Sequence, residues 1–259
     1  MQKKQPIGFF DSGIGGLTVL HEALKLLPNE RYIYFSDGDN APYGLRPKEE
    51  VRDLTLDAVA FLAKQGIKAL VVACNTATSV AIEDVRRSYD FPVIGMEPAV
   101  KPAVMSGNRK RVLVFATELT LKEEKFKNLV ARVDTEQVVD YLPLQELVMF
   151  AERFDFDEDK IIPYLKTKLD GLDLSRYGAV VLGCTHFLFF KKYMEKVLPP
   201  EIQIIDGNLG TVKNLKNKLA EHLNNGSGDV TYFLSKKPMP AAHFEKFLQF
   251  LEAQETVRT

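Results

Sequence analysis

The chain has 259 residues, 46% of them hydrophobic, which suits one large soluble domain or two smaller ones. Its 34 Lys and Arg residues balance 35 Asp and Glu residues, so no basic surface is indicated and nucleic acid is not an expected partner. No apolar run approaches the roughly 20 residues of a membrane helix, and the polar N-terminus does not resemble a signal peptide. With only two cysteines, the chain is expected in the reducing cytoplasm.

Short apolar segments alternate along the chain with longer amphipathic stretches. The segments predicted as strands are Ile7–Phe10, Arg31–Phe35, Ala69–Ala73, Val93–Gly95, Arg111–Ala116, Ala179–Gly183 and Ile202–Ile205. Buried strands that alternate with helices of about 10 to 15 residues are typical of parallel βαβ units. The sequence therefore predicts an α/β fold with mainly parallel sheets flanked by helices.

Two segments have the composition of crossings between domains. Glu97–Pro102 contains two prolines, and Asp206–Gly210 contains two glycines. We therefore expect two pseudo-symmetric domains with the active site in the cleft between them. The first domain would comprise residues 1–97 and 211–259, and the second residues 98–210.

A glycine-rich turn, Asp11-Ser-Gly-Ile-Gly-Gly16, follows the first predicted strand and leads into an amphipathic helix that begins near Leu17. Such a turn presents backbone N–H groups that can hold a carboxylate or a phosphate. The Walker lysine is missing and the glycine spacing does not fit Gly-x-Gly-x-x-Gly, which disfavours a nucleotide site. The alternative is a tight turn whose glycines only permit unusual backbone angles.

The loop Asp37–Gly44 follows the second predicted strand and should lie at the same edge of the sheet. Within it, Tyr43 can either reach a substrate or pack its ring down in an ordinary Pro-Tyr-Gly turn. The sequence leaves these two interpretations open.

The two cysteines occupy matching places. Ala69-Leu-Val-Val-Ala-Cys74-Asn75-Thr76 is echoed by Ala179-Val-Val-Leu-Gly-Cys184-Thr185-His186, so each thiol ends a buried strand and precedes small polar residues. Ligands bind at this carboxyl end in open α/β sheets. The reference pKa of cysteine, about 8.5, can be lowered so that a thiolate and a thiol coexist near neutral pH. Such a pair suits a reaction that removes a proton from one face of a carbon and returns one to the other, as racemisation does.

These residues also allow other interpretations. Unpaired cysteine often serves as a buried apolar filler, an interpretation that the repeated Cys-polar-polar pattern weakens. A disulfide would need the two strand ends within bridging distance. A zinc site is disfavoured because Cys-Thr-His lacks the usual ligand spacing. His186 can orient or stabilise an ionised neighbour, whereas His21, His222 and His243 have no comparable setting.

Several motifs together resemble the glutamate racemase family, over a stretch from about Ile7 to Asp206. They are, in chain order, Asp11-Ser12-Gly13-Ile14-Gly15-Gly16, Pro42-Tyr43-Gly44, Cys74-Asn75-Thr76, Glu97-Pro98-Ala99 and Gly183-Cys184-Thr185-His186. The resemblance implies interconversion of L- and D-glutamate without a pyridoxal or metal cofactor. It also implies a homodimer that supplies D-glutamate for bacterial peptidoglycan. Glutamate is the expected small-molecule partner, and no membrane association is expected.

The resemblance also implies roles for individual residues. Cys74 would exchange the α-proton of D-glutamate and Cys184 that of L-glutamate, with Asp11 assisting Cys74, and with His186 and Glu152 assisting Cys184. The substrate contacts that it implies are Asp11, Ser12, Tyr43, Gly44, Asn75, Thr76, Thr117, Thr185 and His186, with Thr120 as a less specific addition.

The sequence departs from the family pattern in several places. Gly38-Asp39-Asn40 stands where a Ser or Thr, an Ala and an Arg are usual, Phe187-Leu188 replaces Tyr-Pro, and Gly207-Asn208 and the tail Ser235–Pro240 are atypical. These departures bear on loop geometry and substrate preference. The alternatives are a racemase of another acidic amino acid such as aspartate, or a racemase-like glutamate-binding regulatory protein.

Overall fold

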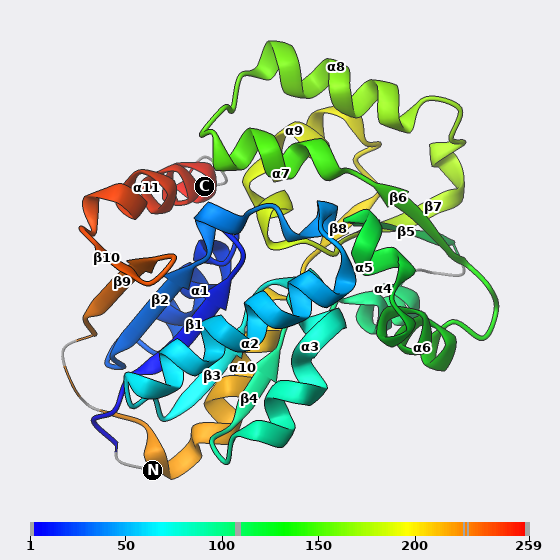
Figure 1. Cartoon of the computed structure of the whole chain (residues 1–259). Helices are drawn as coiled ribbons and strands as arrows, with labels where there is room; N and C mark the ends of the chain where they lie inside the picture. Colours follow the sequence, from blue (N-terminus) through cyan, green and yellow to red (C-terminus); the bar gives the residue numbers. More distant parts are fainter. Residues whose placement is uncertain (1–2, 107–109, 225, 227, 257–259) are drawn as a thin grey trace.

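The computed structural model describes residues 3–106, 110–224, 226 and 228–256, which form two sheets covered by helices (Figure 1). The first sheet has the strand order β10-β9-β2-β1-β3-β4. Its strands are β1 (Ile7–Asp11), β2 (Tyr32–Ser36), β3 (Ala69–Val72), β4 (Val93–Gly95), β9 (Val230–Leu234) and β10 (Lys237–Met239). The second sheet has the order β6-β5-β7-β8. Its strands are β5 (Arg111–Ala116), β6 (Val139–Pro143), β7 (Tyr177–Leu182) and β8 (Gln203–Ile205).

Helices cover both faces of the first sheet because successive strand residues point to opposite faces. In β1, Phe9 packs in the apolar cluster with α1 (Leu17–Leu26), α10 (Asn208–Leu219) and α11 (Ala242–Thr256). The next residue, Phe10, packs in the cluster with α2 (Lys48–Lys64) and α3 (Asn75–Ser88). Two short 3-10 turns, η1 (Gly38–Asn40) and η2 (Tyr43–Leu45), connect β2 to α2.

The second sheet is covered in the same alternating way. Its helical elements are α4 (Val100–Ser106), α5 (Glu118–Lys122), α6 (Glu124–Val133), α7 (Gln145–Glu152), α8 (Glu158–Leu169), η3 (Leu174–Arg176), η4 (Thr185–Phe190) and α9 (Lys191–Val197), and η5 (Ala220–His222) follows α10. Val114 packs in the cluster with α4 and α6, whereas Phe115 packs in the cluster with α7, α8 and α9.

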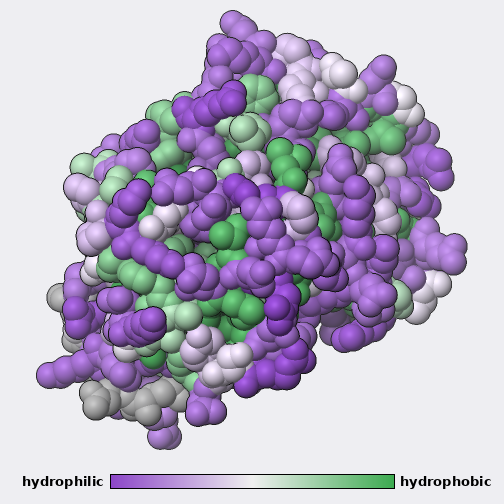
Figure 2. Space-filling view, viewed as in Figure 1, coloured by the Kyte–Doolittle hydropathy of each residue, from purple (hydrophilic) through white to green (hydrophobic). Residues whose placement is uncertain are grey.

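One apolar cluster extends across both sheets. Phe9 of the first sheet and Phe115 of the second belong to it, as do buried residues of α1, α7 and η4. Elsewhere the two halves meet through ion pairs: Lys48 Nζ lies 2.6 Å from Glu123 Oε2, and Lys125 Nζ lies 3.0 Å from Glu97 Oε1 and 3.3 Å from Glu83 Oε1. Polar residues dominate the face drawn in Figure 2, with hydrophobic residues showing between them in smaller areas.

The predicted fold class is confirmed, because the paired strands are parallel apart from the β9–β10 hairpin. Each predicted strand is present with ends that differ by at most two residues, and α1 begins at Leu17 as expected. The sequence interpretation missed β6, β9 and β10. All three lie at or near the edge of a sheet and are only partly buried, so their apolar patterns are weak. In the described segments, no helix combines the length and hydrophobicity of a transmembrane span.

Candidate active site

The two cysteines are free thiols that line one small cavity between the carboxyl ends of the two sheets. Cys74 follows β3 and caps α3, while Cys184 follows β7 and precedes η4. The cavity is lined by Ser12, Pro42, Tyr43, Gly44, Cys74, Asn75, Thr76, Thr117, Gln145, Val148, Cys184, Thr185 and His186. Its volume of about 10 Å³ is roughly that needed for one water molecule.

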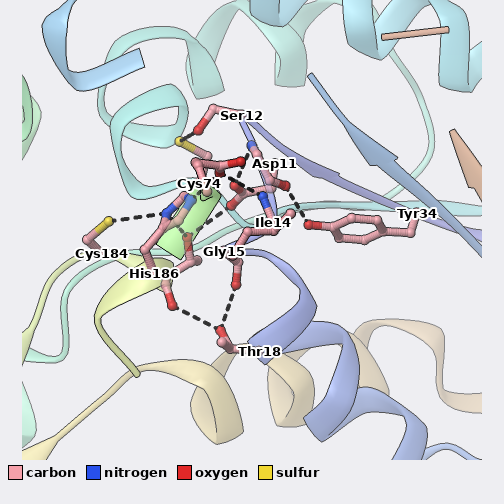
Figure 3. Close-up of polar contacts among 12 residues, drawn as sticks. Asp11, Ser12, Ile14, Gly15, Thr18, Tyr34, Cys74, Cys184 and His186 are labelled. Carbon is pink, nitrogen blue, oxygen red and sulfur yellow. Dashed lines mark hydrogen bonds and ion pairs between the residues drawn. The ribbon is translucent and has the colours of Figure 1, made fainter. Parts of the chain in front are cut away.

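On the Cys184 side, the sulfur faces a buried histidine (Figure 3). Cys184 Sγ lies 3.7 Å from His186 Nδ1, and His186 Nε2 lies 2.6 Å from Glu152 Oε1. Glu152 Oε1 also accepts a 2.9 Å hydrogen bond from the N–H of Ile14. Burial alone would lower the pKa of His186, but its contacts with Cys184 and Glu152 raise it well above 6.5. The imidazole can therefore carry a proton that it shares with the Cys184 sulfur.

On the Cys74 side, the groups within hydrogen-bonding distance of the sulfur are neutral. Ser12 Oγ lies 3.4 Å from Cys74 Sγ, and the N–H of Ala77 donates to the same sulfur over 3.4 Å. Burial raises the pKa of Cys74 from 9.0 to about 12, and the negative charge of Asp11 makes a smaller contribution in the same direction. In this state of the protein, Cys74 holds its proton as a thiol.

Asp11 lies behind the cavity rather than in its lining. Its Oδ1 accepts from the N–H of Gly13 over 2.9 Å, and its Oδ2 accepts from Thr185 Oγ1 over 3.1 Å. Burial raises the pKa of Asp11 from 3.8 to about 6, and the positive charge of His186 opposes the rise. The hydrogen bonds of Asp11 join the glycine-rich turn to the residue after Cys184, while its negative charge acts on the Cys74 thiol. Its expected assistance to Cys74 stays a prediction.

The glycines of the turn are required by close packing. A Cβ on Gly13 would lie 1.7 Å from Glu152 Oε1, and a Cβ on Gly15 would lie 2.3 Å from Thr185 Oγ1 and 2.4 Å from His186 Nδ1. Neither glycine has a positive φ, so the interpretation of unusual backbone angles does not hold for them. Their missing side chains let η4 and Glu152 approach the N-terminus of α1.

Threonine hydroxyls join the two halves of the site. Thr76 Oγ1 lies 3.0 Å from Thr117 Oγ1 and 3.1 Å from Thr120 Oγ1, and the last two are 2.9 Å apart. Asn75 Nδ2 donates to the carbonyl of Met96 over 3.2 Å. These short polar side chains are suited to contacts with a small, charged ligand.

Tyr43 satisfies both sequence interpretations in part. Its ring is buried against Phe10, while it also lines the cavity. Its hydroxyl donates to Asp37 Oδ2 over 2.6 Å, and burial with the charge of Asp37 raises the pKa of Tyr43. The phenol therefore holds the η2 turn, including Gly44, against the rest of the site.

Comparison with known proteins assigns the chain to a family. Residues 17–215 match the family model described as Asp/Glu/Hydantoin racemase. The chain belongs to that racemase family. The racemase is 58% identical over 233 residues to glutamate racemase 2 of Bacillus subtilis, covering 88% of each chain.

Two solved structures resemble this racemase along almost its whole length. The glutamate racemase of Francisella tularensis in complex with D-glutamate has a TM-score of 0.82 and 29% identity, covering 95% of this chain and 94% of that one. The Escherichia coli glutamate racemase in complex with L-glutamate and the activator UDP-MurNAc-Ala has a TM-score of 0.82 and 30% identity, covering 95% of both chains.

Two atypical segments of this racemase contact each other. Ser235, in the turn between β9 and β10, donates through Oγ to Asp37 Oδ1 over 3.0 Å. The same Ser235 Oγ accepts from the N–H of Asp39 over 3.1 Å, and Asn40 Nδ2 donates to both oxygens of Asp37. Since Asp37 also accepts from Tyr43, the tail helps to fix one wall of the cavity.

The structure brings the predicted site residues together, with Asp11 and Glu152 just behind the lining. Sequence reasoning missed Gln145 and Val148, which also line the cavity. They belong to α7, outside the motifs that carry the family resemblance, and a glutamine at the start of a helix gives no local signal of binding. Across the described ranges, no group of three or more His, Cys, Asp or Glu side chains is arranged to hold a metal ion.

Proposed function

We propose that this protein interconverts L- and D-glutamate by proton transfer between the substrate α-carbon and two thiols, without pyridoxal or metal. The observation that carries the proposal is that two free cysteines from equivalent strand ends line one cavity. Membership of the racemase family and the glutamate-bound relatives support the choice of substrate. The roles proposed for Cys74, Cys184, His186 and Glu152 are supported by their contacts, and the role proposed for Asp11, assistance to Cys74, is supported by the family resemblance.

The proposed reaction is a proton exchange between two faces of one carbon. For L-glutamate, the Cys184 thiolate removes the α-proton, and the electron pair of the broken C–H bond moves toward the α-carboxylate. The Cys74 thiol then gives its proton to the opposite face of the carbon, which leaves D-glutamate, a thiol at Cys184 and a thiolate at Cys74. The reverse reaction exchanges these roles.

The surrounding residues support each stage. His186, held by Glu152, places a positive charge beside Cys184 and can share its proton. Short polar groups such as Asn75, Thr76 and Thr185 bind the substrate and offset the charge that develops on its α-carboxylate. A water-poor cavity strengthens these interactions.

The wider proposal concerns the protein in the cell and its assembly. We propose a cytoplasmic homodimer that supplies D-glutamate for peptidoglycan, with neither nucleic acid nor membrane as a partner. We also propose that residues 1–97 with 211–259, and residues 98–210, form two domains that separate to admit substrate. The small volume of the cavity supports such an opening.

Circular dichroism of purified, chelator-treated protein tests the activity without added cofactor. With L-glutamate, the optical signal of the amino acid should decay to zero as the racemic mixture forms. A parallel reaction with L-aspartate tests the alternative acidic substrate, and decay with aspartate alone would replace the proposal. Binding of glutamate with a stable optical signal would instead favour a regulatory protein.

A further inference from the structure

Gln145, the first residue of α7, has a buried amide without a partner at the wall of the cavity. The residue is only 9% exposed and lines the cavity with both thiols. Neither its Nε2 nor its Oε1 has a hydrogen-bond partner. A buried polar group without a hydrogen-bond partner destabilises the folded protein. An amide kept in such a place therefore indicates a partner that comes with the substrate.

The position of Gln145 is fixed by tight packing against two substrate-site residues. A Cβ on Gly44 would lie 2.5 Å from Gln145 Oε1 and 2.8 Å from Thr117 Cβ. The amide therefore lies beside the η2 turn and the threonine hydroxyls, at the seam where both sheets contribute to the cavity. A side chain at position 44 would displace it.

The unpaired atoms around the cavity match the hydrogen-bonding groups of an amino acid. Gln145 Nε2 is an unpaired donor, while Gln145 Oε1 and Asn75 Oδ1 are unpaired acceptors. A carboxylate accepts hydrogen bonds, and an ammonium group donates them. The carboxylate and ammonium groups of an amino acid can thus satisfy groups that the folded protein leaves unsatisfied.

We propose that Gln145 is a substrate-binding residue whose Nε2 donates to a carboxylate oxygen of the substrate. This inference rests on the proposed function. The bound carboxylate belongs to the α-carbon or to the side chain of the amino acid, and the two sources share the same chemistry. Only a contact with the side-chain carboxylate would contribute to a preference for acidic amino acids, because every amino acid carries the α-carboxylate.

Gln145→Met tests the contact, since methionine has similar length and no amide. We expect KM to rise about 10-fold or more for both L- and D-glutamate, with a smaller effect on kcat, because a single hydrogen bond to a charged group is lost. Gln145→Glu should raise KM further, since its carboxylate repels that of the substrate. Without substrate, the melting temperature of Gln145→Met should equal or exceed that of the wild type, which a merely structural role would not produce.

Gln254→Met is the matched control. Gln254 Nε2 donates to the carbonyl of Phe189 over 2.8 Å, away from the cavity. This variant should lose stability and keep the wild-type KM. If Gln145→Met and Gln145→Glu kept KM within twofold of the wild type, the inference would be overturned.

Two inhibitors identify the carboxylate. Norvaline lacks the side-chain carboxylate of glutamate, and 4-aminobutanoate lacks the α-carboxylate. Gln145→Met should weaken inhibition by whichever analogue keeps the carboxylate that Gln145 binds, and equal inhibition of wild type and variant by both analogues would contradict the contact. If wild-type protein failed to racemise glutamate, the proposed function would fail, and equilibrium binding of D-glutamate to wild type and Gln145→Met would still test the contact.

Discussion

The two sides of the cavity carry the same reactive group in different surroundings. Cys74 has a serine hydroxyl and a backbone N–H as neighbours, whereas Cys184 has the His186–Glu152 pair. The strands β3 and β7 place the two sulfurs in equivalent positions, but among the described residues the Cys74 side has no counterpart of the His186–Glu152 pair. The equivalent strand ends thus supply the geometry of the proposed two-base reaction, and the unmatched side chains set the protonation of the site before substrate binds. The resting proton lies on Cys74, and the extra positive charge lies beside Cys184.

The largest effect is expected from removing either sulfur. Cys74→Ala or Cys184→Ala should lower racemisation about 1,000-fold or more, because each direction of the proposed reaction needs one base and one acid. Optical rotation or circular dichroism of glutamate measures the loss. Near-normal turnover by either variant would reject the two-thiol mechanism.

His186→Asn should remove the feature that most distinguishes the two sides. A positioned acid or base contributes about 100-fold to 10,000-fold, so we expect a loss in that range, with the kcat for L-glutamate affected most. Equilibrium fixes the ratio of catalytic efficiencies, so any asymmetry must appear in kcat with compensating changes in KM. Deuterium incorporation from solvent, followed for each enantiomer, measures the two half-reactions. Wild-type exchange of both α-protons would leave His186 without a catalytic role.

Asp11 connects the two sides, and its burial predicts a dependence of stability on pH. Because the folded pKa is raised from 3.8 to about 6, the folded protein keeps a proton that the unfolded chain loses between these values. The contribution of Asp11 to the stability of the wild type should therefore fall as pH rises from 4 toward 7, by about 3 kcal/mol for a shift of this size.

Asp11→Asn should remove that fall in stability, because the amide does not titrate, and it should impair activity. The fold should be kept, since the Thr185 hydroxyl can turn to accept a hydrogen bond from the new amide. Urea unfolding at pH 4.5 and pH 7.5 provides the measurement. Equal pH slopes for wild type and Asp11→Asn would show that Asp11 does not titrate in this range.

The smallest effect is expected from Ser12→Ala. The Ser12 hydroxyl is a neutral neighbour of Cys74, so its loss should cost about 1 kcal/mol, or roughly fivefold in turnover. Steady-state kinetics of Ser12→Ala beside those of His186→Asn would quantify the contrast between the two sides. A loss as large as that of His186→Asn would mean that the Cys74 side also depends on a strong proton-transfer partner.

Much of this architecture follows from local patterns in the sequence. Each apolar strand and each Cys-polar-polar motif is a run of consecutive residues, so the position of each cysteine at the carboxyl end of a strand could be predicted. The link from Ser235 to Asp37 could not, because it joins segments that are distant in sequence and depends on the pairing of β2 with β9. Gln145 was missed for a related reason: only the folded cavity distinguishes its unpaired amide from that of a surface glutamine.

The order of the strands in the first sheet has a consequence for synthesis on the ribosome. The second sheet has all of its strands once Ile205 has been made, whereas the first sheet waits for β9 and β10 from the C-terminal tail. Phe244 of α11 and Leu215 of α10 also complete the apolar cover over Phe9 and Tyr34. A nascent chain that stops near residue 205 therefore exposes that apolar face, so the half of the protein that is synthesised first is the half that finishes folding last.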